Sequence, residues 1–264
     1  MIIDFHAHAF PDELAPKALK KLAYKSHVKP SFDGTVSGLL KSMDKAGIEK
    51  SVLLNIATRP EQTEKIIAWC LGIKSERIIP FASIHPENKN IGALAGRIKG
   101  EGLPGVKLHP MYQDFSMDEE RLFPLYEALR KEGLLLLLHT GFDIAFPEDK
   151  RAEMKRLKNI IIRFPGLRII ASHTGGWKMW AEVLDVIAGS DIWLEISMTM
   201  KYIEDMGLFF EILEKHSGDK ILFGTDAPWA GQKEEALNFK KLNLGKEIED
   251  RIFYKNALAL LASV

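Results

Sequence analysis

The 264-residue chain is 46% hydrophobic and can bury a large core, which excludes a disordered protein and a small disulfide-stapled domain. Its 36 basic residues balance its 36 acidic residues, which argues against a nucleic-acid partner, and no apolar run of about 20 residues predicts a membrane span. The single cysteine, Cys70, favours a reducing, cytoplasmic location.

Short apolar runs alternate with longer amphipathic stretches along the whole chain. An almost continuously apolar run is typical of a strand that is covered on both faces of a parallel sheet. The predicted strands are residues 1–5, 51–56, 78–84, 105–108, 134–138, 167–171, 192–196 and 220–223. The predicted helices are residues 36–46, 61–71, 117–131, 148–164, 202–216, 233–242 and 246–261. Residues 9–34, which contain Pro11, Pro16 and Pro30, are predicted to form an enlarged first loop that could be part of a lid.

Strands that alternate with helices fit two architectures, a closed (β/α)8 barrel and an open doubly wound sheet. The first predicted strand continues into Asp4-Phe5-His6-Ala7-His8. Because residues i and i+2 of a strand point to the same face, the imidazoles of His6 and His8 can converge on one metal ion. The alternative is that two partly exposed histidines happen to alternate.

Three other predicted strands also end beside a polar side chain. His139 follows the fifth strand, His173 follows the sixth, and Asp226 follows the eighth. Each alone has a structural explanation, either a buried histidine bonded to a carbonyl group or an aspartate that caps a helix. In a closed barrel, however, the carboxyl ends of all strands meet at one mouth, where active sites are built. The clustering predicts a single (β/α)8 TIM barrel over residues 1–264.

These five residues, in this order, resemble the amidohydrolase superfamily of metal-dependent barrels. The set is similar to the branch that includes aminocarboxymuconate semialdehyde decarboxylase and related hydrolases and decarboxylases. The resemblance implies that His6, His8 and His139 are metal ligands and that Asp226 is a ligand or an acid–base group. It also implies that His173 lies beside the metal as an acid–base or electrophilic residue, or binds a second ion.

The implied ligand set suits a divalent metal ion. Three imidazoles and one carboxylate suit a single divalent ion, most readily zinc, with manganese, iron or nickel as alternatives. The ion would lower the pKa of a bound water to about 7. Asp226 could then accept the proton of that water, and His173 could polarise a carbonyl group or protonate a leaving group.

Lys107 and His109 share a face at the end of the fourth predicted strand. We expect both to bind an anionic substrate. The alternatives are a salt bridge in the barrel mouth, or the carboxylated lysine that bridges two metals in binuclear members of the superfamily. Trp177 is predicted to face the substrate, whereas Glu195 could form an ion pair inside the barrel or contribute a carboxylate to the site.

The expected activity is hydrolysis of a C–N or C–O bond in a small molecule, with a metal-activated water as the nucleophile. The alternative is a lyase that removes carbon dioxide from an aromatic or unsaturated acid without oxidation. A third hypothesis is a metal-binding sensor or scaffold without catalysis, which would be expected to lack His173 or Asp226. The resemblance also makes a homodimer plausible.

Overall fold

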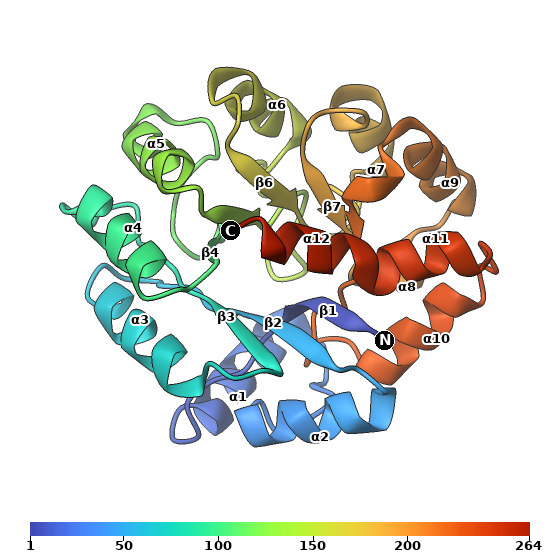
Figure 1. The fold of residues 1–264 in the computed structure, drawn as a ribbon, viewed down its shortest axis with the longest axis horizontal. Helices are drawn as coiled ribbons and strands as arrows, with labels where there is room; N and C mark the ends of the chain where they lie inside the picture. The colour runs from blue at the N-terminus through green and yellow to red at the C-terminus, as the bar shows by residue number, and fades with distance from the viewer.

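The apolar runs form a closed ring of parallel strands in the computed structural model, which describes residues 1–264 (Figure 1). Hydrogen bonds between neighbouring strands join β1, β2 and β3 into one sheet and β4, β5, β6, β7 and β8, in that order, into another. Parallel bridges between Ala82 and Val106 and between Ala7 and Ala227 join the two sheets and close the barrel. The (β/α)8 prediction is therefore confirmed. The strands are β1 (Ile3–Ala7), β2 (Lys50–Leu54), β3 (Ile78–Phe81), β4 (Gly105–Leu108), β5 (Leu135–Leu138), β6 (Arg168–Ala171), β7 (Trp193–Glu195) and β8 (Ile221–Leu222).

Helices surround the ring of strands, as Figure 1 shows. They are α1 (Ala15–Ser26), α2 (Val36–Ala46), α3 (Gln62–Ile73), α4 (Ile91–Gly100), α5 (Phe123–Glu132), α6 (Met154–Arg163), α7 (Trp180–Glu182), α8 (Thr199–Tyr202), α9 (Met206–Lys215), α10 (Gln232–Lys240), α11 (Lys246–Asp250) and α12 (Asn256–Ala262). Short 3-10 turns are η1 (Glu120–Leu122) and η3 (Gly218–Lys220), and π turns are η2 (Val183–Ile187) and η4 (Arg251–Lys255). None of these helices combines the length and the apolar character needed to cross a membrane.

The barrel interior is filled by apolar side chains from opposite strands. One buried cluster contains Ile3, Phe81, Leu135 and Leu222, which come from strands on different sides of the barrel. Side chains from such strands can touch only inside the barrel. Leu260 of α12 belongs to the same cluster, so this helix closes the end of the barrel where the strands begin. The polar side chains lie at the opposite end of the barrel, where the strands stop.

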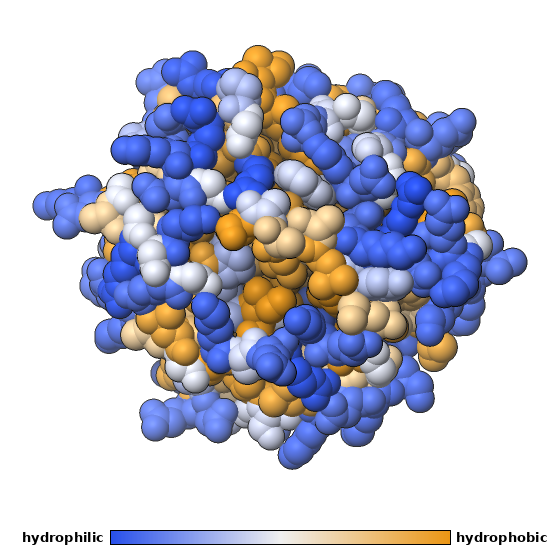
Figure 2. All heavy atoms as spheres, in the orientation of Figure 1, coloured by the Kyte–Doolittle hydropathy of each residue, from blue (hydrophilic) through white to orange (hydrophobic).

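Figure 2 shows the face of the molecule that α12 crosses. Apolar side chains gather near its centre, and hydrophilic side chains cover its rim. A pocket of about 310 Å³ on the molecule is lined by Pro80, Leu103 and Leu261, among others. Ile78 and Pro104, which also line it, lie at the starts of β3 and β4, so this pocket is separate from the polar side chains at the strand ends.

The segment predicted as an enlarged first loop contains a helix. Residues 9–34 include α1, and their prolines lie at positions that a helix tolerates. Pro16 lies in the first turn of α1, where a missing N–H costs nothing, while Pro11 precedes the helix and Pro30 follows it. The structure thus corrects the loop prediction, because prolines at helix boundaries give the same sequence signal as prolines in a loop.

Candidate active site

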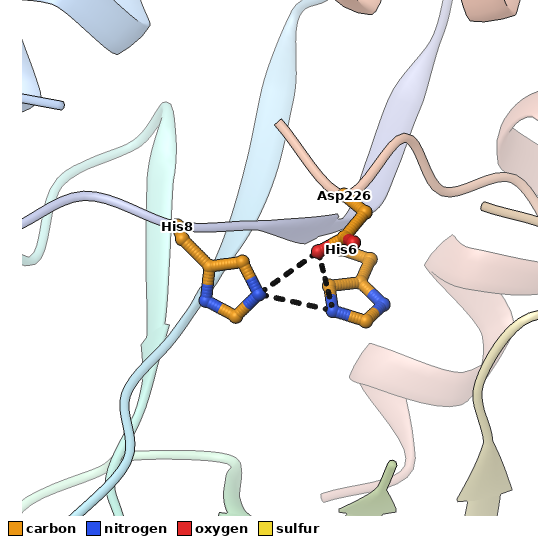
Figure 3. Close-up of side chains that lie close together, drawn as sticks. All are labelled: His6, His8 and Asp226. Atoms are coloured by element: carbon orange, nitrogen blue, oxygen red, sulfur yellow. Dashed lines mark hydrogen bonds and ion pairs between the residues drawn. The ribbon is translucent and has the colours of Figure 1, made fainter. Parts of the chain in front are cut away.

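The first and last strands bring His6, His8 and Asp226 together. The bridge between Ala7 and Ala227 holds the end of β1 against the segment that follows β8. Nε2 of His6 lies 3.2 Å from Nε2 of His8, and Oδ1 of Asp226 lies 3.3 Å from the first and 3.0 Å from the second (Figure 3). Three possible ligand atoms therefore face one point.

The hydrogen-bond partner of Nδ1 fixes the tautomer of each imidazole. Nδ1 of His6 lies 2.7 Å from a carboxylate oxygen of Glu195, and Nδ1 of His8 lies 2.9 Å from the carbonyl oxygen of Leu54. Carboxylates and carbonyl groups only accept, so both Nδ1 atoms carry the hydrogen and both Nε2 atoms carry a lone pair. Together with Asp226, three lone-pair atoms meet without a hydrogen between them. A divalent cation would relieve this repulsion, so the residues fit a metal ion.

The electrostatics keep these groups in the forms that bind metal. Burial lowers the pKa of His6 well below its usual value, so the ring is neutral at neutral pH. Burial alone would raise the pKa of Asp226, yet its pKa lies below the usual value, so the carboxyl is ionised at neutral pH. A neutral imidazole and an ionised carboxylate are the protonation states that metal binding requires.

Asp226 has a backbone conformation that most residues avoid. Its φ of 64° lies in the left-handed region, and such positions persist where neighbouring groups hold them. Its N–H donates to the carbonyl oxygen of His6 over 2.7 Å. The buried carboxyl of Asp4 receives the N–H and hydroxyl of Thr225 and the side-chain amide of Gln232, at 2.7–3.0 Å. Asp4 thereby ties β1 to the segment that presents Asp226.

His139 and His173 form a second contact pair in the same barrel mouth. Nδ1 of His139 lies 3.2 Å from Nε2 of His173, and the ring centroids of His173 and His6 are 5.2 Å apart. Nε2 of His139 lies 3.1 Å from the carbonyl oxygen of Phe142. The structure therefore brings three of the four predicted metal ligands together and places His139 next to His173.

Glu195 and Ser197, at the end of β7, connect the two groups of histidines. The carboxylate of Glu195 is fully buried and receives Nδ1 of His6, the backbone N–H of His173 and the hydroxyl of Ser197, at 2.7–2.9 Å. Of the two alternatives for Glu195, the structure favours the site carboxylate. Its only sequence signal is a charge within an apolar strand, and Ser197 has no such signal.

The residues predicted to bind substrate have buried polar atoms without partners. Nζ of Lys107, Nδ1 of His109 and Nε1 of Trp177 are all buried and make no hydrogen bond. Burial lowers the pKa of Lys107 to about 8. Buried polar groups are normally paired, so these atoms are available to a ligand that supplies the missing contacts. Lys107 makes no salt bridge within the protein, so the structure does not show the salt bridge in the barrel mouth that was one alternative for this residue.

A further group of possible ligands is better explained by stacking. Nitrogen atoms of His109 and His139 and an oxygen of Asp143 lie within 4.8 Å of one another. The two rings, however, are parallel to within 9°, with centroids 4.1 Å apart. Lone pairs in parallel planes run side by side instead of converging on one ion. We therefore assign His109, which was predicted to bind substrate, and Asp143, which was not predicted, to the wall of the barrel mouth.

Glu235 of α10 is a buried carboxyl that gives a testable dependence of stability on pH. Burial raises its pKa to about 8, against an ordinary value of 4.5. Between these values the folded protein binds the extra proton, so the free energy of unfolding falls as pH rises. We expect Glu235→Gln to remove this loss, with a gain of at most about 1.4 kcal/mol per pH unit. Urea unfolding at pH 5 and pH 8 measures it, and an equal effect at both values contradicts the expectation.

Comparison with known proteins now gives the family. The sequence pattern described as amidohydrolase matches residues 3–262. The chain belongs to the amidohydrolase family. The resemblance noted at the strand ends is therefore confirmed, and with it the expectation of an enzyme scaffold that carries candidate metal-binding groups.

Solved structures share the barrel of this amidohydrolase. An uncharacterised TIM-barrel protein from Bordetella bronchiseptica is 22% identical, with a TM-score of 0.80, over 99% of this chain and 98% of that chain. The 5-carboxyvanillate decarboxylase from Sphingomonas paucimobilis is 14% identical, with a TM-score of 0.70, over 99% and 98%. A protein described as 2-pyrone-4,6-dicarboxylic acid hydrolase from Pseudomonas putida is 16% identical, with a TM-score of 0.71, over 99% and 97%. At these identities the likeness shows the fold.

A curated relative matches only part of this amidohydrolase. A dihydroorotase from Shewanella piezotolerans is 33% identical over 85 residues, which are 28% of this chain and 24% of the dihydroorotase. The match thus spans about a quarter of that relative's length.

Proposed function

We propose that this amidohydrolase is a metal-dependent hydrolase that cleaves a C–N or C–O bond of a small anionic molecule. The observation that carries the proposal is the meeting of lone pairs on His6, His8 and Asp226 within 3.3 Å of one another. Lone pairs this close repel one another unless a cation lies between them. The unpartnered Lys107 lies on β4, which ends at the same mouth.

The chain's own residues divide the work of hydrolysis. A divalent ion supplies positive charge that polarises a substrate carbonyl and makes water a better nucleophile at neutral pH. His6, His8 and Asp226 would hold it, and His139, the fourth predicted ligand, contacts His173. Asp226 and His173 are the groups that can accept and return the proton of the attacking water.

Elemental analysis of the purified protein tests the metal directly. We propose one zinc ion per chain, since imidazole and carboxylate ligands suit zinc and Nε2 of His6, Nε2 of His8 and Oδ1 of Asp226 face one point. Manganese, iron or nickel remain compatible with the same ligands. Two ions per chain would contradict the single site.

A substrate screen tests the reaction class. Esters, lactones and amides that carry a carboxylate are expected to be hydrolysed, because the site has both a water-activating group and an acid–base group. Hydroxybenzoates and unsaturated dicarboxylates serve as the second arm. Release of carbon dioxide from this arm, without hydrolysis in the first, would replace the proposal.

Decarboxylation is the second candidate function. It needs a group that holds the carboxylate and a group that protonates the carbon that loses carbon dioxide. The buried ammonium of Lys107 can do the first and His173 the second. The structurally similar 5-carboxyvanillate decarboxylase gives a precedent for this chemistry on the same fold.

Lys107→Met separates a substrate-binding lysine from a carboxylated one. We expect the variant to keep its metal and to raise KM for an anionic substrate by about 10- to 100-fold, because a charge-assisted hydrogen bond contributes about 1.5–3 kcal/mol. Steady-state kinetics and metal content measure both effects. Loss of metal in the variant, together with a need for bicarbonate when metal is restored to the wild type, would instead indicate a carboxylated lysine.

A further inference from the structure

The hydroxyl group of Ser197 lies between His173 and Glu195. Its Oγ is 2.8 Å from Nδ1 of His173 and 2.8 Å from Oε1 of Glu195. The exposed fractions of His173, Glu195 and Ser197 are 3%, 0% and 0%, so bulk water has little access to these contacts. The orientation of the His173 ring is therefore set by protein groups.

The carboxylate of Glu195 is itself held in place. Oε1 accepts from Nδ1 of His6 and from the backbone N–H of His173, and Oε2 accepts from the backbone N–H of Ser197. The chain also leaves room for this carboxylate, since a Cβ atom at Gly224 would lie 2.2 Å from Oε2. Glu195 is therefore a fixed negative charge behind both His6 and Ser197.

The hydrogen-bond donors around Ser197 determine where the hydrogen of His173 lies. A serine hydroxyl has one hydrogen, and a bond to a carboxylate is stronger than a bond to a neutral imidazole. The hydroxyl of Ser197 therefore donates to Glu195, and its lone pair faces Nδ1 of His173. The carbonyl oxygen of Ser197 lies 3.3 Å from the same nitrogen and can only accept. Nδ1 of His173 thus carries the hydrogen, and Nε2, which lies 3.2 Å from Nδ1 of His139, carries a lone pair.

We propose that Ser197 is a positioning residue that, backed by Glu195, holds His173 in the Nδ1–H tautomer, so that Nε2 enters the site as a proton acceptor. The proposal rests on the proposed function in taking His173 as the acid–base group. Nε2 accepts a proton from the attacking water as the new C–O bond forms. The same proton then passes to the leaving nitrogen or oxygen as the C–N or C–O bond breaks, so that one water is added overall.

Nitrogen NMR of the histidine rings tests the tautomer without any substrate. In the ¹⁵N-labelled full chain, with and without added Zn²⁺, we expect His173 to carry its hydrogen on Nδ1, with its signals assigned by their loss in His173→Asn. Ser197→Ala should shift the ring towards the Nε2–H form, and Ser197→Thr, which keeps the hydroxyl, should restore the wild-type pattern. An Nε2–H ring in the wild type, or an unchanged tautomer in Ser197→Ala, overturns the proposal.

Ser172→Ala is the matched control, because Ser172 is equally buried and adjacent to His173 but donates to the carbonyl oxygen of Leu138. We expect this variant to keep the wild-type tautomer, and a shift like that of Ser197→Ala would count against a specific role. On an ester or amide that the wild type hydrolyses, Ser197→Ala should lower kcat about 10- to 100-fold with little change in KM. An absence of hydrolysis would reject the proposed function, while the NMR result would still decide the role of Ser197.

Discussion

Replacement of His6 and His8 together with alanine is expected to abolish metal binding and leave the barrel folded. The two Nε2 atoms supply two of the three converging lone pairs, and their loss leaves Asp226 alone. Loss of an outer hydrogen-bond partner already weakens metal affinity by about 10- to 100-fold, so loss of two ligands should exceed that range. Metal content after dialysis and the circular dichroism spectrum measure the two parts of the expectation.

His85→Ala is the control for this double variant. His85 also follows a barrel strand and is buried, but its Nδ1 accepts from the backbone N–H of Glu87 and it belongs to none of the ligand groups. We expect it to keep the full metal content. If the double variant of His6 and His8 also keeps its metal, the assignment of the metal site is wrong.

His173→Asn is expected to keep the metal and lose most of the turnover. The asparagine side chain can still reach Ser197 in place of Nδ1, but no atom replaces Nε2. Because general acid–base groups contribute about 10²- to 10⁴-fold, kcat should fall by a factor in that range. Steady-state kinetics on a substrate found in the screen, with parallel metal analysis, measures the effect.

A different result for this variant would change the description of the site. If metal content falls in proportion to kcat, His173 is itself a ligand. Nδ1 of His139 lies 3.2 Å from Nε2 of His173, so the two imidazoles would then bind an ion together. Elemental analysis of the variant distinguishes this outcome from simple loss of a proton acceptor.

The barrel and the place of its site could be predicted because both depend on local patterns. An apolar run predicts a strand, and a polar residue at its end predicts a side chain at the carboxyl mouth, as for His139 and Asp226. Which of those side chains touch depends on the loops. Sequence reasoning grouped His139 with the ligands at β1, whereas the structure pairs its ring with His173 and stacks it on His109.

Ser197 and Asp143 could not be predicted for a related reason. Ser197 lies in the short connection between β7 and α8, and Asp143 lies in the longer connection between β5 and α6; packing, not periodicity, sets the course of both. Ser197 also meets residues that are distant in sequence: it lies 24 residues from His173, and its hydroxyl is 3.3 Å from Nδ1 of His6, which is 191 residues away. No spacing motif connects residues that meet only when the barrel has closed.

The join between β1 and β8 has a consequence for the order of folding. Residues that join β1 to the segment after β8 are far apart along the chain: Asp4 and Thr225 are separated by 221 in residue number, and pairing of such distant segments is slow. His6 and His8 lie on one side of the join and Asp226 on the other. An incomplete nascent chain therefore contains the imidazoles long before the carboxylate, and the ion can bind fully only after the last strand has docked. The proposed ion would bind the closed barrel and not the open one, so it would stabilise the closed barrel by an amount that grows with metal concentration.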